Sequence, residues 1–273
     1  MKIEFLFPEL VTLYGEKANV EYLAKCLPQA QIVTTKLTEG PAFAIRQDNK
    51  AAAITPPDFV YIGSMEEDFF EAAIAALKPY KKALEKYIKS GRIFLATGNA
   101  IDIFGRTIEW KDRVYPDGHI ADCTIEGLGL FDLKSVVRRD YSRHNSWYYG
   151  EFEGMKILGH RSTFSRQYGG EKDPFIQTLG GFGMNDETKQ EGVHRDGFYG
   201  TTLLGPLLIM NPPLTKYLIG KMTERGARPA DTDPAKAAPP VNLFEEKWVM
   251  EAYENRLSYL SKPGARYEMG ALG

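Results

Sequence analysis

The sequence predicts an α/β fold with a mostly parallel, doubly wound central sheet. Up to Gly105 the chain alternates between strand-like and helix-like segments, which is typical of parallel sheets covered by helices. Within this part, residues 93–96 form a continuous apolar run, as expected for a strand that is buried on both faces. Ligands of such sheets bind beyond the carboxyl ends of the strands, so the loops after Phe7, Ile62 and Ala96 are the expected walls of a site.

The elements of this first half follow from local patterns. β-rich or apolar runs predict strands at residues 3–7, 31–37, 59–62 and 93–96. Apolar residues on one face predict a helix over 19–26. The alanine-, glutamate- and lysine-rich stretch over 66–90 predicts a helix that is broken near Pro79 and ended by Gly91. Residues 41–51 show no clear pattern.

The second half reads as shorter strands with polar connections. We place strands at 107–110, 113–115, 147–153, 156–160, 174–179 and, with a turn, 198–208, followed by a helix at 214–222. Residues 127–132 form a glycine-punctuated loop or strand. The glycine cluster at 180–183 favours a tight turn over a phosphate-binding loop, because no strand–GxGxxG–helix context surrounds it.

The composition changes near the C-terminal end of the sequence. Residues 224–240 are rich in proline and alanine and poor in large apolar residues, which is typical of a linker. We therefore divide the chain into a domain over 1–222, a linker over 223–241 and a C-terminal helix and tail over 242–273. The helix expected at 244–261 should pack back on the domain, and docking of a partner chain is the alternative.

Bulk properties exclude several classes of function. The formal net charge is −2 and the pI is near 6.2, so nucleic-acid binding is not expected. The two cysteines lie in no CxxC pair and the four histidines are scattered, so we expect no metal and no cofactor. The first residues read as a strand without a signal peptide, and no apolar run of about 18 residues predicts a membrane span. A cytoplasmic protein with reduced thiols is expected.

The stretch around Thr97-Gly98-Asn99 dominates the functional argument. It joins a buried strand to a helix start, and such a strand-to-helix elbow is where many α/β enzymes present a nucleophile. Here the tip falls on Gly98, which has no side chain.

Several motifs, in this order, resemble the class I glutamine amidotransferases of the cobyric acid synthase type. Within that family the chain is most similar to the amidotransferase subunits of lipid II isoglutaminyl synthases, which work with Mur-ligase-like partners in Gram-positive cell walls. The resemblance covers about residues 1–222. It is carried by Phe7-Pro-Glu-Leu, Leu13-Tyr-Gly-Glu-Lys-Ala-Asn19, Phe59-Val-Tyr-Ile-Gly-Ser64, Glu126-Gly-Leu-Gly-Leu-Phe-Asp132, Gly180-Gly-Phe-Gly-Met-Asn185, Glu191-Gly192 and Gly200-Thr-Thr-Leu-Leu-Gly-Pro-Leu-Leu208 with Asn211-Pro212.

The departures from the family pattern lie at the positions that carry its chemistry. The resemblance places the nucleophilic cysteine at Gly98, the nearby glutamine at Asp102 and the histidine at Leu204. Two glycines of the oxyanion loop are replaced in Gly63-Ser64-Met65. Glutamine hydrolysis needs a thiolate to attack the amide and a histidine to activate the thiol and protonate the ammonia. Neither is present here, so the resemblance implies a retained fold without the reaction.

Three hypotheses follow from this pattern. The leading one is a catalytically silent amidotransferase-like protein that acts as the partner of a Mur-ligase-like synthetase. The second is an active amidotransferase or hydrolase with another nucleophile, for which the candidates are Thr97, Ser64 and Cys123. The third is an interaction module that docks through the helix at 244–261.

A small ligand in the altered site is a related expectation. Its candidate contacts are Gly63, Ser64, Thr97, Asn99, Asp102 and His160. Asp102 is either a binding group or a helix-start residue that favours the helix dipole. His160 is either a residue that shapes the site or a hydrogen-bonded structural histidine. Cys123 is expected in a loop and Cys26 on the first helix.

Overall fold

The computed structural model describes residues 1–44, 55–139, 143–226 and 241–268. Its strands form a nine-stranded sheet with the order β2-β1-β3-β4-β13-β12-β11-β8-β9 and a four-stranded sheet with the order β10-β7-β5-β6. The strands are β1 (Lys2–Leu6), β2 (Gln31–Thr35), β3 (Phe59–Ile62), β4 (Ile93–Ala96), β5 (Thr107–Val114), β6 (Ile120–Glu126), β7 (Leu133–Arg138), β8 (His144–Phe152), β9 (Met155–Thr163), β10 (Ser165–Gly169), β11 (Pro174–Gly180), β12 (Gln190–Arg195) and β13 (Phe198–Gly200).

The first five strands of the large sheet are parallel, as predicted. β1 pairs with β2 and β3, and β4 pairs with β3 and β13, all in parallel register. β3 and β4 are buried over their whole length because helices cover both faces. From β12 to β9 the large sheet is antiparallel, so it is mixed overall.

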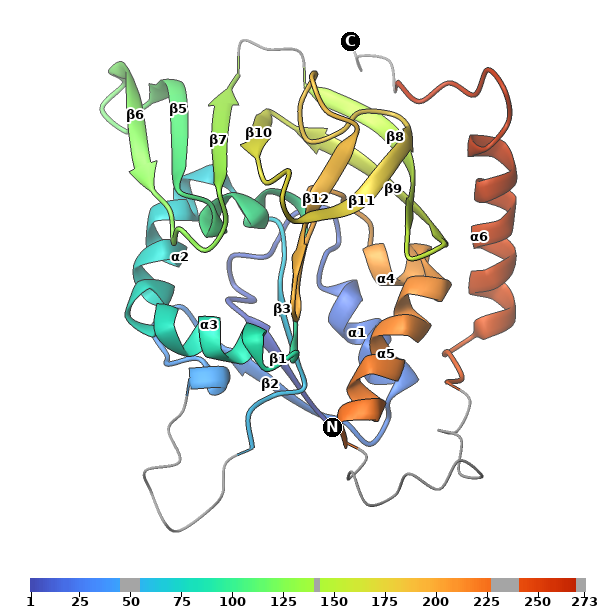
Figure 1. Ribbon diagram of the computed structural model, residues 1–273. Helices are drawn as coiled ribbons and strands as arrows, with labels where there is room; N and C mark the ends of the chain where they lie inside the picture. The colour runs from blue at the N-terminus through green and yellow to red at the C-terminus, as the bar shows by residue number, and fades with distance from the viewer. Residues whose placement is uncertain (45–54, 140–142, 227–240, 269–273) are drawn as a thin grey trace.

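The helices lie on both faces of the large sheet, which gives the predicted three-layer α/β arrangement (Figure 1). α2 and α3 lie on one side, and α1, α4 and α5 lie on the other. The helices are α1 (Ala18–Cys26), α2 (Phe70–Leu77), α3 (Lys81–Lys89), α4 (Leu207–Met210), α5 (Pro212–Gly226) and α6 (Glu246–Leu260), with 3-10 turns η1 (Ala42–Ala44), η2 (Glu67–Phe69), η3 (Lys78–Tyr80) and η4 (Gly98–Phe104). The predicted break near Pro79 is confirmed, since η3 separates α2 from α3.

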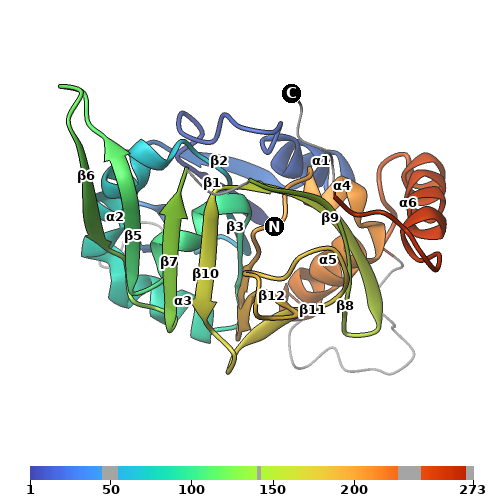
Figure 2. The same ribbon diagram turned by 90° about the horizontal axis from the view of Figure 1, so that it is seen from above.

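The small sheet stands beside the helix layer of α2 and α3 (Figure 2). The sequence analysis missed four of the strands, namely β6, β7, β10 and β12. β6 also corrects the expectation for Cys123, which lies in this strand and not in a loop. The strands predicted at 107–110 and 113–115 are one strand, β5, whose register with β6 shifts between Trp110 and Arg113. β6 is largely exposed, whereas β10 and β12 bury polar side chains such as Gln167 and Glu191, so none of these strands shows the apolar–polar alternation on which strand prediction depends.

α6 packs against the outer part of the large sheet. Tyr253 and Leu260 form a small apolar cluster with Leu158 of β9, and Tyr253 Oη donates a 2.8 Å hydrogen bond to Lys156 O. The helix expected at 244–261 is therefore present and contacts its own chain. Residues 45–51 of the unassigned stretch and most of the predicted linker, 227–240, lie outside the described residues.

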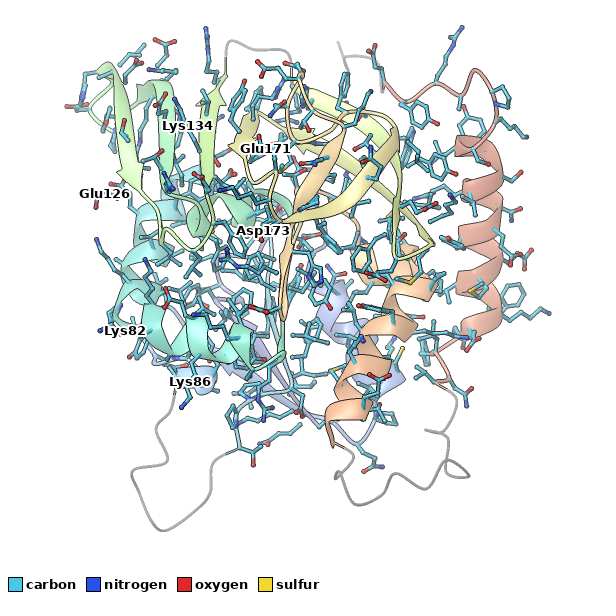
Figure 3. The ribbon with its side chains drawn as sticks, in the orientation of Figure 1. Lys82, Lys86, Glu126, Lys134, Glu171 and Asp173 are labelled. Carbon is cyan, nitrogen blue, oxygen red and sulfur yellow. The ribbon has the colours of Figure 1, made fainter. Side chains whose placement is uncertain are left out.

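Charged side chains of both signs lie on the surface, and Lys78 of η3 pairs with Glu126 at 3.9 Å. Lys82 and Lys86 lie on α3, and Glu126 lies at the end of β6 (Figure 3). No described helix combines the length and the apolar character that a membrane span needs.

Candidate functional site

The predicted elbow follows β4 directly. Thr97 continues the extended backbone, and its N–H donates to Ile62 O at 3.1 Å. Gly98 then has φ +61°, a left-handed conformation that glycine adopts far more easily than other residues. The chain continues as the 3-10 helix η4 instead of the α-helix that the apolar spacing suggests. The turn that presents a nucleophile in related folds is therefore built here on a residue without a side chain.

The space next to Gly98 is filled by two neighbouring side chains. A Cβ atom on Gly98 would overlap Ser64 Oγ, and it would lie 2.8 Å from Leu204 Cδ2 and 3.0 Å from Ser64 Cβ. These separations are shorter than van der Waals contact between carbon atoms. Ser64 and Leu204 are themselves almost fully buried, at 1% and 2% exposure. Gly98, Ser64 and Leu204, three departures from the expected family pattern, thus pack against one another. Ser64 comes from the loop after β3 and Leu204 from the segment after β13, and they fill the space that a side chain at position 98 would need.

A cavity of about 160 Å³ opens beside this unit. The three loops that the sequence analysis indicated supply much of its wall, and the turn between β9 and β10 closes it. The lining residues are Leu13, Tyr14, Ser64, Glu67, Gly98, Asn99, Arg139, Arg143, Ser162, Thr163, Phe164, Thr202 and Leu204.

Two arginines give the cavity positive charge. Arg139 pairs with Glu67 at 3.2 Å, whereas Arg143 forms no ion pair within the described part of the chain. Both guanidinium groups lie over the ring of Phe164, at 5.7 and 4.6 Å from its centroid. Ser64 Oγ makes no hydrogen bond to any described residue. The cavity therefore offers cations and a free hydroxyl to an anionic ligand of a few heavy atoms.

A buried carboxylate joins the segments behind the cavity. Glu16, fully buried in the loop after β1, accepts hydrogen bonds from Thr97 Oγ1, from Tyr61 Oη at 2.9 Å and from Gly205 N at 3.2 Å. The Ser64 N–H also donates to it. Burial raises the pKa of the Glu16 carboxyl, and these hydrogen bonds oppose the rise. Glu16 thus ties the elbow, the loop after β3 and the segment after β13 to one point.

Asp102 requires a correction, because it does not line the cavity. It is a fully buried residue of η4, and its Oδ1 accepts hydrogen bonds from Ser135 Oγ at 2.7 Å and from Gln167 Nε2 at 2.8 Å. Its Oδ2 has no hydrogen-bond partner. Burial raises the pKa of Asp102 to about 6, against the lowering effect of its hydrogen bonds to Ser135, Gln167 and Ser165. Asp102 therefore joins η4 to the small sheet and does not contact a ligand directly.

His160 also lies outside the cavity wall. Its backbone forms a bridge with Leu204, the residue at which the resemblance places the histidine of the family motif. The imidazole packs 6.0 Å from the ring of Tyr14 and 6.2 Å from that of Trp147. Burial and the nearby Arg256 lower its pKa. No histidine is among the described residues that line the cavity, so the imidazole base that the resemblance implies is not found among them.

The other candidates are distributed around the elbow. Ser64 and Asn99 line the cavity, and Asn99 is held by Met65, whose N–H donates at 3.1 Å and whose O accepts at 2.7 Å. Thr97 points away from the cavity to Glu16, and Gly63 is packed so closely that a Cβ would lie 2.8 Å from Val11 Cγ1. Cys123 is absent from the lining residues. Of the three proposed replacement nucleophiles, only Ser64 faces the cavity.

Sequence reasoning missed the residues that give the cavity its charge and its far wall. Arg139 follows β7, a strand that the pattern did not reveal. Arg143 precedes β8, which begins earlier than predicted, and Thr163 ends β9, which is longer than predicted. Glu16 lies in a motif that was used only for the resemblance. The available signal was the position of Glu16 in the loop between a strand and a helix, because an acidic residue in such a loop can reach the carboxyl ends of the strands. No group of described residues could hold a metal ion.

Comparisons with known proteins agree with the fold and the motifs. The chain is 29% identical over 176 residues to the GatD subunit of lipid II isoglutaminyl synthase (glutamine-hydrolyzing) from Staphylococcus aureus strain N315, a match that covers 63% of this chain and 66% of that relative. The chain is glutamine amidotransferase-like. It is also 25% identical over 226 residues to the subunit of the same name from Streptococcus pneumoniae R6, covering 80% of this chain and 79% of that relative. No protein-family model matches the chain.

The chain spans just under two thirds of the staphylococcal relative's length. Among solved structures, a glutamine amidotransferase matches with a TM-score of 0.48 at 12% identity, covering 81% of this chain and 98% of that one. The glutaminase domain of the Trypanosoma brucei CTPS with bound acivicin matches with a TM-score of 0.46 at 7% identity, covering 82% and 94%. Likenesses at these TM-scores carry no weight for function. The fold itself is α/β and class I glutamine amidotransferase-like, as the topology and the sequence similarity together indicate.

Proposed function

We propose that this protein is a non-hydrolysing subunit of a cell-wall amidation system in the cytoplasm, where it binds a Mur-ligase-like synthetase. The similarity to two GatD subunits of lipid II isoglutaminyl synthases supports the setting. In this reading the chain keeps the amidotransferase scaffold as a binding surface, and it does not release ammonia from glutamine.

One observation carries the loss of hydrolysis. The Cβ position of the missing nucleophile is already occupied by Ser64 Oγ and crowded by Leu204 Cδ2. An attacking atom at the elbow would need that space, and a proton carrier would need the position that Leu204 fills. In this proposal the site differs from an active one by more than a single sulfur atom, because Ser64 and Leu204 fill the space that the nucleophile would occupy.

The direct test measures ammonia release from glutamine by the purified protein, alone and with a synthetase encoded near it in its genome. We expect no release above the buffer background in either case, together with co-elution of the two proteins in size-exclusion chromatography. Glutaminase turnover that the Ser64→Ala substitution abolishes would overturn the proposal. If the two proteins do not co-elute and no ammonia is released, the partner assignment is wrong and the loss of hydrolysis stands.

The enzymatic alternative rests on Ser64, because its hydroxyl faces the cavity without a hydrogen-bond partner in the described structure. An active serine requires a base within hydrogen-bonding reach, and the described lining residues include Glu67 but no histidine. Labelling with a serine-reactive fluorophosphonate discriminates the two readings. Stoichiometric labelling of Ser64 would favour a hydrolase, and we expect none.

We also propose that the cavity binds a small anion. Arg139 and Arg143 supply the charge, and among the described residues the one carboxylate paired with either of them is that of Glu67, on Arg139. The test is a thermal-shift screen of small carboxylates and phosphates, with Arg143→Gln as the variant and Arg106→Gln, a surface arginine paired to Asp132, as the matched control. A stabilising compound should lose its effect in the first variant and keep it in the second. Equal shifts in both variants would place binding elsewhere.

Docking through α6 remains the proposal for the partner surface. α6 buries Tyr253 and Leu260 on its own chain but leaves Trp248 and Tyr259 61% and 56% exposed. Exposed aromatic residues are enriched at protein interfaces. Trp248→Ala with Tyr259→Ala should weaken co-elution with the synthetase, whereas unchanged co-elution would exclude this face.

A further inference from the structure

One side of the segment formed by η3 and α3 carries a row of lysines. Lys78, Lys82, Lys86 and Lys89 follow one another at steps of four, four and three residues, which places them along a single side of a helix. All four are exposed, and Figure 3 shows Lys82 and Lys86 projecting away from the body of the protein. This row, the lysine stripe, extends over roughly 17 Å at the rise of an α-helix.

The opposite side of α3 fixes the direction in which the stripe faces. Leu84, Tyr87 and Ile88 are buried there, and Tyr87 Oη donates a 3.0 Å hydrogen bond to Ile93 O of β4. These side chains hold α3 against the large sheet. The lysines on the other side of the helix therefore face solvent together.

Little of the described negative charge balances the stripe. Residues 78–92 contain five lysines, one arginine and a single acidic residue, Glu85, whereas the whole chain has a formal net charge of −2. Glu85 is half-buried beside the stripe. Lys78 lies 3.9 Å from Glu126, but both side chains are largely exposed, so water screens this pair. The other three lysines of the stripe form no ion pair with a described residue.

We propose that the lysine stripe docks the protein on an anionic membrane surface. Clusters of four or more basic residues on one helix are attracted to the anionic lipids of a cytoplasmic leaflet. A straight row on one side of a helix meets a plane along its whole length, which suits a bilayer surface. A polynucleotide partner is disfavoured, because nucleic-acid-binding domains are basic as a whole and this chain is not.

This surface lies away from the surface proposed for the partner protein. Figures 1 and 2 both place α3 and α6 on opposite sides of the molecule. The protein can therefore contact a bilayer through α3 and a synthetase through α6 at the same time. The inference rests on the proposed function for its purpose, since the synthases of the two relatives are named for lipid II and a lipid resides in a bilayer.

The test measures sedimentation of the purified protein with vesicles, without glutamine or a synthetase. Vesicles of equal parts phosphatidylcholine and phosphatidylglycerol are compared with vesicles of phosphatidylcholine alone at low ionic strength. Each lysine near an anionic surface contributes about fivefold to the partition coefficient, so four lysines give a coefficient on the order of 10³ M⁻¹. We expect half of the protein on the anionic vesicles at about 1 mM accessible lipid, none on the neutral vesicles, and release as salt is added.

Matched variants separate the stripe from the charge of the whole protein. Lys82→Gln with Lys86→Gln should lower the partition coefficient about 25-fold. Lys82→Arg with Lys86→Arg keeps both charges and should bind like the parent. Lys221→Gln with Lys262→Gln removes the same charge from two exposed lysines outside the stripe and should change binding by less than about twofold.

Three results would overturn the inference. They are no sedimentation with anionic vesicles at millimolar lipid, equal binding to neutral vesicles, and equal losses in the two glutamine double variants. Retention of a single-stranded oligonucleotide without vesicle binding would assign the stripe to nucleic acid instead. If Lys82→Gln with Lys86→Gln does not fold, the vesicle comparison and the salt dependence of the parent decide the question. None of these results bears on ammonia release or co-elution, which test the proposed function.

Discussion

Restoring a side chain at the elbow is the most direct test of the structural argument. Gly98→Cys adds a Cβ atom that overlaps Ser64 Oγ and comes within 2.8 Å of Leu204 Cδ2. Ser64 Oγ can rotate away, but Ser64 Cβ at 3.0 Å and the buried leucine remain. The φ of +61° at Gly98 adds backbone strain for any residue with a Cβ.

The expected destabilisation can be summed from these contributions. Overpacking of a buried site costs about 1–3 kcal/mol, and a non-glycine residue in the left-handed region costs about 1–2 kcal/mol. The smaller entropy of the unfolded chain returns about 0.4–1 kcal/mol. Gly98→Cys should therefore lower the free energy of unfolding by about 1–4.5 kcal/mol. Gly98→Ala, which adds the same Cβ without sulfur, should show most of this loss.

Urea unfolding and ammonia release together form the assay. Adding Ser64→Gly to Gly98→Cys removes the serine atoms but leaves the contact with Leu204 Cδ2, so it should recover part of the overpacking loss of about 1–3 kcal/mol. Neither variant should hydrolyse glutamine, because Leu204 still occupies the position of the base. Only Gly98→Cys combined with Ser64→Gly and Leu204→His has the required groups. The reasoning is refuted if Gly98→Cys is as stable as the parent, or if it alone releases ammonia.

Three further predictions concern the buried polar groups. Asp102 has its folded-state pKa raised from 3.8 to about 6, so the native state binds the extra proton, and the free energy of unfolding should fall by about 3 kcal/mol as pH rises from 3 to 7. The difference between parent and Asp102→Asn in urea unfolding isolates this loss, and a constant difference across that range would contradict it. Glu16→Ala leaves the Tyr61 and Thr97 hydroxyls and the Gly205 N–H without their acceptor, so it should lower the free energy of unfolding by about 2–4 kcal/mol. Glu16→Gln keeps one acceptor oxygen and should cost about 1 kcal/mol. Equal losses of stability in thermal unfolding would show that hydrogen bonding at Glu16 is not the cause. Arg161 and Glu191 form a fully buried ion pair at 3.2 Å, so Arg161→Met should lower the free energy of unfolding by about 3–5 kcal/mol. Adding Glu191→Gln removes the charge left unpaired and should regain part of this stability in the same denaturation assay. If the losses of the two substitutions simply add, the two residues are not coupled.

The sequence by itself determined the α/β class and the elbow. Apolar runs such as Ile93–Ala96 and helical periodicity such as that around Pro79 depend on local spacing, which the chain carries directly. The glycine at the tip of the elbow was visible in the same way, because it is a property of one position. The loops around the cavity followed from the rule that parallel strands place their carboxyl ends at one edge.

Only the tertiary structure decided how the altered positions relate to each other. Gly98, Ser64 and Leu204 lie far apart in the sequence, and their mutual packing depends on which loops the sheet order brings together. The position of Asp102 was decided in the same manner, since its partners come from β7 and β10, two strands without a clear sequence pattern. Contacts between distant segments depend on strand order and side-chain direction, and neither quantity is a function of local spacing.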